Sequence, residues 1–443
     1  GITAPITKWS YQIRRPEDVS WAVARAFYIA QSGRPGPVVL DFTKNAQLEM
    51  FEGYKPSICN FIRSYQPEPD VSEKEILAAA NLINSAKKPF ALVGQGVTLG
   101  EAEEELKEFL LKANIPAAWT LLGESAMPTD FPLNKGMLGM HGNVAPNMKT
   151  NECDVLIAIG MRFDDRVTGN LNTYAKQAKI IHLDIDPAEI SKNVKADAPV
   201  LGNVKKTLPM LTKLLKENSH EAWIESFKEH EIKEYDLVIK KEIECEEGKI
   251  KMGEVISKIS KATNHEAILV TDVGQNQMLA ARYFKFRKNR SVVTSGGLGT
   301  MGFGIPAAIG AKVAAPERTV CLFTGDGGFQ MTMQELGTIM QSKIGVKMII
   351  LNNRFLGMVR QWQELFHEER YSSTNMINPD FLTIAKGFNI KGREVSERSE
   401  LDAAIAEMLQ DDDAYLLVVN VEKKGMVFPM VPAGGSVSEM LMG

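Results

Sequence analysis

Short apolar runs alternate with amphipathic stretches along most of the chain. Residues 17–32 carry apolar side chains at helical spacing, with Pro16 at the start and Gly33 after the end, so they predict a helix. Apolar runs between turn residues predict strands at Pro37–Phe42, Phe90–Val93, Ile115–Trp119, Val155–Ile159, Ile180–Asp184, Ile268–Val270, Ser291–Thr294, Val320–Phe323, Lys347–Leu351 and Tyr415–Asn420. Strands that alternate with helices form parallel sheets, so the pattern predicts a multidomain α/β protein with doubly wound parallel sheets.

Breaks in this pattern divide the chain into segments. The helix and strand near the start are too few to bury a core, so they indicate the C-terminal remnant of a first domain. Ser72 and Glu75 predict a capping box at the start of the second domain, in which each side chain binds the backbone amide of the other residue. The expected segments are a remnant at 1–50, a linker at 51–70, a central α/β domain at 71–215, a charged linker at 216–250, and a last α/β domain with a C-terminal tail at 251–443.

Composition excludes several classes of protein. The 443 residues are 44% hydrophobic and 24% charged, which suits several folded cores. A net charge of −4 without long runs of one sign gives no support for nucleic-acid binding. The weakly polar stretch Gly296–Ala315 is interrupted by glycines, Pro306 and Lys312, so no membrane span is expected, and with no secretory leader we predict a cytoplasmic protein. The scattered cysteines fit reduced thiols: Cys59, Cys153, Cys245 and Cys321.

The strongest chemical signal is Gly325-Asp326-Gly327, followed after 24 residues by Asn352-Asn353. Each motif follows a predicted strand, and open parallel sheets bind ligands outside the carboxyl ends of their strands. The Asp326 carboxylate and the Asn353 amide oxygen are therefore expected to lie together. Such oxygen ligands suit Mg²⁺, which completes its shell with phosphate and water, while the glycines let backbone amides approach the phosphate. Two ordinary turns after strands are the alternative.

These motifs and three others resemble the thiamine diphosphate-dependent enzymes, and in particular the large catalytic subunit of acetolactate synthase (acetohydroxyacid synthase). The other motifs are Ser295–Gly302, Gly160–Asn170 and Leu356–Gln363, and the resemblance covers nearly the whole chain. It implies a thiamine diphosphate-binding fold with a central, Rossmann-like FAD-binding domain. The implied reaction decarboxylates pyruvate and joins the remaining two-carbon group to a second pyruvate or to 2-ketobutyrate, giving 2-acetolactate or 2-aceto-2-hydroxybutyrate for branched-chain amino-acid synthesis.

The resemblance places thiamine diphosphate and Mg²⁺ in the last domain. The metal ligands would be Asp326, Asn353 and the backbone carbonyl of Phe355. Met301 would wedge the cofactor into a bent shape that brings its own amino group to the reacting carbon. By itself Met301 could equally be a core residue, since the chain has 21 methionines. The other implied cofactor contacts are Gln275, Asn276, Gly299, Gly325, Gly327, Gly328, Gly357, Met358 and Val359.

The resemblance also implies that the central domain binds FAD in a structural role. The turn Gly94-Gln95-Gly96 follows a predicted strand, which agrees with this, although such a turn is as often only a tight turn. Asn203 stands where the family has a carboxylate, so one flavin contact is expected to be weaker. His141 is interpreted as structural rather than as a base. The implied flavin contacts are Arg34, Gly94, Gly96, Met140, His141, Gly160, Arg162, Asp164, Arg166, Val167 and Asp184.

The resemblance assigns a few residues to the substrate. Arg166 would grip the carboxylate of the second 2-ketoacid, because a guanidinium binds carboxylates through two parallel hydrogen bonds. Trp362 would wall the acceptor site, Met358 is grouped with it, and Lys44 matches a family lysine near the active-site channel. A surface ion pair of Arg166 with a nearby aspartate and a packing role for Trp362 are the alternatives.

The family forms its active site between the pyrimidine-binding domain of one subunit and the diphosphate-binding domain of another. A homodimer or homotetramer is therefore expected, with a small regulatory subunit as a further partner. The glutamate that activates the cofactor in this family would lie upstream of Gly1, so we expect the polypeptide alone to be inactive. The rival functions are another thiamine diphosphate-dependent 2-ketoacid oxidase or decarboxylase, a non-catalytic cofactor-binding fragment, and a nicotinamide dehydrogenase built on two Gly-rich turns, Gly94-Gln95-Gly96 and Gly297-x-Gly299-x-x-Gly302.

Overall fold

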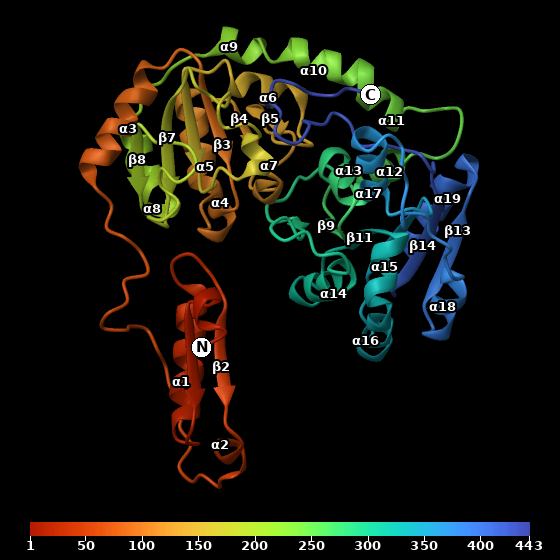
Figure 1. Ribbon diagram of the computed structural model, residues 1–443, viewed down its shortest axis with the longest axis horizontal. Helices are drawn as coiled ribbons and strands as arrows, with labels where there is room; N and C mark the ends of the chain where they lie inside the picture. The colour runs from red at the N-terminus through yellow and green to blue at the C-terminus, as the bar shows by residue number, and fades with distance from the viewer.

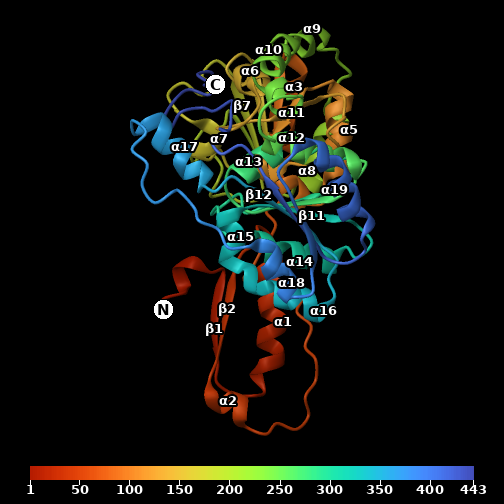
Figure 2. The same cartoon turned by 90° about the vertical axis from the view of Figure 1, so that its right-hand side faces the viewer.

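The protein, described here by a computed structural model of all 443 residues, has an N-terminal unit, a central unit and a C-terminal unit (Figure 1). The central and C-terminal units lie side by side, and a helical connector crosses over both. The N-terminal unit, red in the picture, extends away from them, and the 90° view in Figure 2 shows β1, β2 and α1 of this unit running alongside one another. None of the helices combines the length and the apolar character that a bilayer crossing requires.

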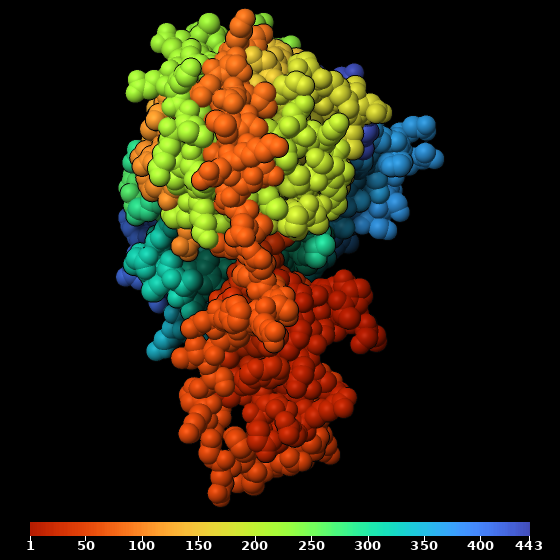
Figure 3. Space-filling view, turned by 90° about the vertical axis from the view of Figure 1, so that its left-hand side faces the viewer, coloured from red at the N-terminus to blue at the C-terminus, as the bar shows by residue number.

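The N-terminal unit consists of two parallel strands and a covering helix. Strand β1 (Trp9–Ile13) pairs with β2 (Val38–Phe42), and α1 (Asp18–Gln31) packs against both. Their small core contains Ile13, Ala22 and Ala46. The other elements are a 3-10 turn at Ala4–Ile6 and α2 at Lys44–Leu48. Residues 49–72 contain no helix or strand, and Figure 3 shows this segment, in orange, climbing from the N-terminal unit to the central unit.

The central unit has a six-stranded parallel sheet in the order β5-β4-β3-β6-β7-β8. Its strands are β3 (Pro89–Val93), β4 (Ala117–Trp119), β5 (Asn134–Met137), β6 (Val155–Ile159), β7 (Lys179–Asp184) and β8 (Ala198–Leu201). Its helices are α3 (Glu73–Ser85), α4 (Gly96–Leu99), α5 (Glu103–Ala113), α6 (Val144–Thr150), α7 (Asp165–Thr168) and α8 (Val204–Leu214), with a 3-10 turn at Leu121–Gly123. From β3, the strands β4 and β5 extend the sheet toward one edge. From β6, the strands β7 and β8 extend it toward the other edge. A crevice for ligands is therefore expected at the carboxyl ends of β3 and β6.

The capping box predicted at the start of α3 forms only in half. The Ser72 hydroxyl accepts from the Glu75 amide at 3.4 Å. The Glu75 carboxylate does not return to Ser72, however, but accepts from the Leu201 amide at 3.3 Å. Leu201 lies on β8, the last strand of the sheet, so its outward amide has no neighbouring strand to bind. This second half of the capping-box prediction was therefore wrong.

The C-terminal unit has a second six-stranded parallel sheet, in the order β10-β9-β11-β12-β14-β13. Its strands are β9 (Ile268–Thr271), β10 (Val292–Val293), β11 (Val320–Gly325), β12 (Lys347–Asn352), β13 (Lys391–Val395) and β14 (Tyr415–Asn420). Its helices are α12 (Met252–Ala262), α13 (Gln275–Tyr283), α14 (Gly304–Ala314), α15 (Asp326–Thr332), α16 (Leu336–Ser342), α17 (Gly357–Phe366), α18 (Phe381–Gly387) and α19 (Arg398–Gln410), with a 3-10 turn at Met333–Glu335. Here the strand order reverses between β9 and β11.

The connector and the C-terminal tail join the two large units. The connector comprises α9 (Glu221–Glu225), α10 (Lys228–Glu234), a π-helical turn (Tyr235–Ile239) and α11 (Lys240–Ile243). Glu234 of the connector forms a buried ion pair with Arg282 of α13 and accepts from the Val144 amide of α6 at 2.7 Å. The tail after β14 crosses back to the central unit, where the Val431 amide donates to the Met140 carbonyl at 2.8 Å. The relative placement of the two sheets is thus held by buried polar contacts.

Every strand predicted from the apolar runs is present, with ends that differ by at most two residues. In the large units, the strands that the runs did not predict are β5, β8 and β13, and all three lie at sheet edges. Strand β13 contains Lys391, Arg393 and Glu394, which an edge strand tolerates because one side of it faces solvent. The interior strands β3, β6 and β12 are buried along their whole length, which produced the clear apolar signal.

Candidate active site

Asp326 and Asn353 follow neighbouring strands of the C-terminal sheet. Gly325 of β11 pairs in register with Leu351 of β12, so the residues after each strand meet at the carboxyl edge. Both side chains line a small cavity of about 50 Å³. Asp326 is fully buried, and its Oδ2 accepts from Asn378 Nδ2 at 2.7 Å, while its Oδ1 has no hydrogen-bond partner. A buried carboxylate oxygen without a partner is costly unless a cation or a donor binds it, so Oδ1 fits a Mg²⁺ ligand.

The neighbours of Asp326 complete an oxygen-rich but weakly charged site. Burial raises the pKa of Asp326, although the hydrogen bond from Asn378 and nearby backbone amides oppose this shift. Asn353 Oδ1 accepts from the Phe355 amide at 3.1 Å and keeps a second lone pair for a cation. No cluster of three His, Cys, Asp or Glu side chains capable of binding a metal occurs in the structure. A cation here would bind one carboxylate plus amide and carbonyl oxygens, which is usual for Mg²⁺ with phosphate and water.

The walls of this cavity consist of helix N-termini and glycine turns. Gln275 and Asn276 begin α13, and Gly357 begins α17, so two helices direct their N-terminal amides toward it. A Cβ added at Gly357 would lie 2.2 Å from Gln275 Oε1, so the backbone already packs tightly against that side chain. Helix N-termini bind phosphate groups. The predicted contacts Gly325, Gly327, Gly328, Asn353, Phe355, Met358 and Val359 line the same cavity.

The Met301 side chain enters this cavity from the loop before α14. Its Cε is 3.8 Å from the position that a Cβ at Gly327 would occupy. Buried Asp272 holds the loop, because its carboxylate accepts from the amides of Gly302 at 3.1 Å and Gly304 at 2.8 Å. Asp272 was not predicted, although an acidic residue directly after an apolar strand is a detectable signal. Gly299 lies in the same loop but does not line the cavity.

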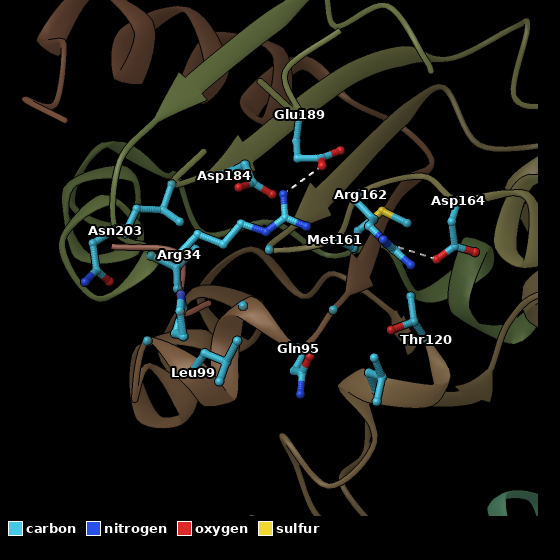
Figure 4. A pocket seen from close by; sticks show the side chains of 18 of the residues that line it. Arg34, Gln95, Leu99, Thr120, Met161, Arg162, Asp164, Asp184, Glu189 and Asn203 are labelled. Atoms are coloured by element: carbon cyan, nitrogen blue, oxygen red, sulfur yellow. Dashed lines mark hydrogen bonds and ion pairs between the residues drawn. The ribbon is translucent and has the colours of Figure 1, made fainter. Parts of the chain in front are cut away.

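A larger cavity, of about 330 Å³, opens where the strand order of the central sheet reverses (Figure 4). Gly94 and Gly96 follow β3 and Gly160 follows β6, and a Cβ added at Gly94 would lie 2.3 Å from the Gly160 carbonyl oxygen. Because these turns are glycine, no side chain fills the space beside them. That space fits a dinucleotide such as FAD. The other predicted residues that line this cavity are Arg34, Arg162, Asp164, Val167 and Asp184.

Charged side chains border the larger cavity. Arg34 reaches it from the N-terminal unit, and its Nη1 binds Glu189 at 2.7 Å and Asp186 at 2.8 Å. Figure 4 shows the Arg34 side chain extended toward Glu189, and on the other side Arg162 directed toward Asp164. Glu189 is buried, and its Oε2 has no partner, so the cavity offers a free acceptor for a ligand hydroxyl or amine.

Comparisons with known proteins give these cavities a chemical context. The family model for the C-terminal TPP-binding domain of thiamine pyrophosphate enzymes matches residues 272–419, and the model for their central domain matches residues 76–211. The acetolactate synthase isozyme 2 large subunit of Escherichia coli (strain K12) is 40% identical over 442 residues, which cover 100% of this chain and 78% of that protein. The chain belongs to the acetolactate synthase large-subunit family.

Other acetolactate synthases agree. The large subunit of Lactococcus lactis is 40% identical over 444 residues, and a probable large subunit of Methanocaldococcus jannaschii is 42% identical over 453 residues; each match covers all of this chain and 76% of the relative. The predicted family, the α/β fold with thiamine diphosphate enzyme domains, and the acetolactate synthase function are thereby confirmed. The protein is a thiamine diphosphate-dependent carboligase, and Mg²⁺ and FAD are the accompanying cofactors of this family.

Three residues expected at the acetolactate synthase flavin site lie outside the larger cavity: Met140, His141 and Arg166. Met140 and Arg166 line a separate cavity of about 170 Å³, which the C-terminal tail closes with Val431–Gly434. Arg166 is exposed, and its Nη1 lies 3.4 Å from Met140 Sδ. It makes no ion pair, so the alternative of a surface pair with an aspartate was wrong. The guanidinium therefore remains free for a carboxylate ligand.

The remaining predicted acetolactate synthase residues differ in their surroundings. Trp362 lies on α17, one turn beyond Met358, and packs against Phe366 with ring centroids 4.9 Å apart. Lys44 is exposed at the start of α2, which Figure 1 shows at the end of the N-terminal unit that points away from the two large units. Asn203 borders the larger cavity, where its Nδ2 donates to Glu68 Oε1 at 2.9 Å. Glu68 of the linker thus places a carboxylate next to Asn203, the position at which the family has a carboxylate of its own.

Gly94→Ala is expected to destabilise the protein by about 2 kcal/mol and to weaken FAD binding. The added methyl group would overlap the Gly160 carbonyl oxygen and lie 2.7 Å from Met161 Cα, and these backbone atoms cannot move without displacing a strand end. Urea unfolding and titration of flavin fluorescence measure the two effects. Gly310→Ala on α14 is the matched control, because an added Cβ there meets nothing within 4 Å. Unchanged flavin affinity in Gly94→Ala would contradict the expected cavity.

His141 is expected to make stability depend on pH. Its ring is buried, and burial together with the positive charges of Arg282 and Arg166 lowers its pKa from 6.5 to about 4. The unfolded chain therefore takes up a proton near pH 6.5 while the folded protein does not. The free energy of unfolding should fall by about 2 kcal/mol between pH 6.5 and pH 5 through this residue.

Urea unfolding of His141→Gln at pH 7.5 and pH 5 isolates this contribution. The variant should lose less stability on acidification than the parent, whereas replacement of the exposed His367 by Gln should leave the parent's pH dependence unchanged. Equal losses in the parent and in His141→Gln would show that the buried ring is not responsible.

Proposed function

We propose that the cavity between β9, β11 and β12 binds thiamine diphosphate through Mg²⁺ and is the site of the acetolactate synthase reaction. The observation that carries this proposal is the buried Oδ1 of Asp326, which lacks a partner and shares the cavity with Asn353 and Phe355. Asp326, Asn353 and the Phe355 carbonyl would hold the metal, and Gln275 and Asn276 at the start of α13 would hold the diphosphate. The bound cofactor supplies a carbanion that attacks 2-ketoacids.

The protein residues would then orient and shield the reaction. We propose that Met301 supports the cofactor from below, and that Met358 and Val359 on the first turn of α17 cover the reacting end. The further contacts proposed for the diphosphate and the rings are Gly299, Gly325, Gly327, Gly328 and Gly357. These residues would exclude water from the reacting end, where a proton would otherwise compete with a second 2-ketoacid for the carbanion that the cofactor would supply.

We propose that Arg166 binds the carboxylate of this second 2-ketoacid, either pyruvate or 2-ketobutyrate. Its exposed guanidinium has no carboxylate partner, which supports this role. Trp362 would limit the size of the acceptor side chain. Lys44 could approach the site only from another copy of the chain, because it lies at the far end of the N-terminal unit.

We propose that FAD occupies the larger cavity with a structural role. Support comes from the glycine packing at the switch point and from the free Glu189 oxygen. The proposed contacts are Arg34, Gly94, Gly96, Met140, His141, Gly160, Arg162, Asp164, Arg166, Val167 and Asp184. Met140, His141 and Arg166 would contact only a part of the flavin that extends beyond this cavity, toward the tail.

Assembly and domain division complete the proposal. The relatives are named large subunits, which supports a small regulatory subunit as a partner, and a homodimer or homotetramer with active sites at the subunit interface is the proposed assembly. We keep the division into 1–50, 51–70, 71–215, 216–250 and 251–443 and the cytoplasmic location as predictions.

Product analysis tests the proposed function. The natural protein, supplied with Mg²⁺, thiamine diphosphate, FAD and pyruvate, should release CO₂ and form 2-acetolactate, and addition of 2-ketobutyrate should give 2-aceto-2-hydroxybutyrate. Acetaldehyde or acetyl phosphate as the main product would instead indicate a decarboxylase or an oxidase.

A further inference from the structure

Asn378 binds the metal-site carboxylate with an amide group whose two N–H hydrogens and oxygen are all hydrogen-bonded. Its Nδ2 donates to Asp326 Oδ2 at 2.7 Å and to Asn352 Oδ1 at 2.9 Å. Its Oδ1 accepts from Gln330 Nε2 at 3.0 Å, and the same Gln330 nitrogen donates to the Asp326 carbonyl at 3.1 Å. One side chain thus joins the residues that end β11 and β12 to the helix that Asp326 begins.

The segment that carries Asn378 is itself attached to the loop with the proposed ligand Phe355. The Leu356 amide donates to the Thr374 carbonyl at 2.8 Å, and the Met376 amide donates to the Arg354 carbonyl at 2.9 Å. Residues 374–378 therefore lie as a strap along residues 354–356, with Phe355 and Asn375 paired as in an antiparallel bridge. The backbone position of Asn378 is set by this strap.

A row of amide side chains continues from Asn378 along the carboxyl edge of the sheet. Asn352 Nδ2 donates to Asn420 Oδ1 at 2.8 Å, and Asn420 Nδ2 donates to Glu394 Oε1 at 2.6 Å. The row crosses the ends of β11, β12, β14 and β13. Ionised carboxylates can only accept, so Asn420 and Asn352 both direct their NH₂ groups toward the Glu394 end, and the Asn352 oxygen is left to accept from Asn378. The Asn378 NH₂ must therefore face Asp326.

We propose that Asn378 is a positioning residue that holds Oδ2 of Asp326, so that Oδ1 alone is presented to the magnesium ion. This inference rests on the proposed thiamine diphosphate site. Mg²⁺ demands nearly octahedral geometry and suits a carboxylate that binds through one oxygen, whereas Ca²⁺ accepts a carboxylate through both. A carboxylate fixed by an outer hydrogen bond is the arrangement that favours the smaller ion.

Metal titration of Asn378→Ala tests the proposal. With saturating thiamine diphosphate, Mn²⁺ binding is followed by the EPR signal of the free ion, and Mg²⁺ and Ca²⁺ are measured by competition. The variant should bind Mn²⁺ and Mg²⁺ about tenfold more weakly, the lower end of the effect typical for outer partners of metal ligands. Its Ca²⁺ affinity should change less, so the preference for Mg²⁺ over Ca²⁺ should fall, which a general loss of structure would not produce.

Asn375→Ala is the matched control, because Asn375 lies on the same strap and its side chain binds only Lys423, at 3.2 Å. It should keep the parent's metal affinities. If Asn378→Ala does not fold, Gln330→Ala replaces it, and the loss of the bond that orients Asn378 should then weaken Mg²⁺ binding in the same direction, by about threefold.

The outcomes separate this inference from the proposed function. If Asn378→Ala, or Gln330→Ala in its place, kept the parent's Mg²⁺ affinity and its preference for Mg²⁺ over Ca²⁺, the positioning role would be overturned. The proposed thiamine diphosphate site would still stand. A parent protein that binds no Mn²⁺ in the presence of thiamine diphosphate would overturn the proposed site, and this inference with it.

Discussion

Replacing Asp326 with Asn is expected to weaken the Mg²⁺-dependent binding of thiamine diphosphate by about 3 kcal/mol, which is about 100-fold, the usual cost of removing one partner from a buried charge pair. Asp326 is fully buried and is the only carboxylate that lines the cavity. The amide that replaces it cannot neutralise the cation. Acetolactate formation at ordinary cofactor concentrations should then disappear. Isothermal titration with thiamine diphosphate at fixed Mg²⁺ measures the affinity.

A matched control for this variant is Glu335→Gln. Glu335 lies shortly after the helix that Asp326 begins, and its partly exposed carboxylate binds only Thr338, at 2.8 Å. Its loss should leave cofactor affinity within twofold of the parent, about 0.4 kcal/mol. If Asp326→Asn also bound the cofactor with nearly parental affinity, the metal would have to be held elsewhere.

In the natural protein, Met301→Ala is expected to lower the maximal rate of acetolactate formation about 100-fold, since a misplacement of reacting groups by about 1 Å can cost that much. The side chain lines the cofactor cavity, but its thioether offers no oxygen ligand to the proposed metal. Thiamine diphosphate affinity should therefore change by less than about threefold, or 0.7 kcal/mol. Steady-state kinetics at saturating cofactor, combined with the titration above, separates rate from affinity.

Met340→Ala serves as the control for Met301→Ala, because Met340 is a half-exposed methionine on α16, outside the cavity. It should retain the parental rate. A Met301→Ala enzyme with a parental rate would show that this side chain packs the loop and does not shape the cofactor.

The centre of each sheet could be predicted from the sequence, because interior strands are apolar along their whole length. The same reasoning located Asp326 and Asn353, since consecutive parallel strands deliver the residues after them to one edge. Edge strands such as β13 were not predicted, because solvent on one side removes the need for an apolar run. The second bond of Glu75 was also beyond sequence reasoning, since it depends on the unpaired amide of a distant edge strand.

Side chains held by irregular segments were the least predictable part of the site. Asn378 reaches the metal carboxylate from a strap with no helix or strand, and no spacing rule connects it to Asp326. Arg166 and Arg34 were predicted by resemblance, yet they line different cavities, and only the cavity of Arg166 is lined by the C-terminal tail. Asp272 could have been found, since it follows an apolar strand as Asp326 does.

The most direct test of the central claim is a crystal structure of the protein with thiamine diphosphate and Mn²⁺, recorded so that anomalous scattering locates the ion. We predict one strong peak about 2 Å from Asp326 Oδ1, Asn353 Oδ1 and the Phe355 carbonyl oxygen, bridged to the diphosphate. A bound cofactor whose ion lies away from Asp326 and Asn353, or a cofactor bound outside the β9–β11–β12 cavity, would contradict the account.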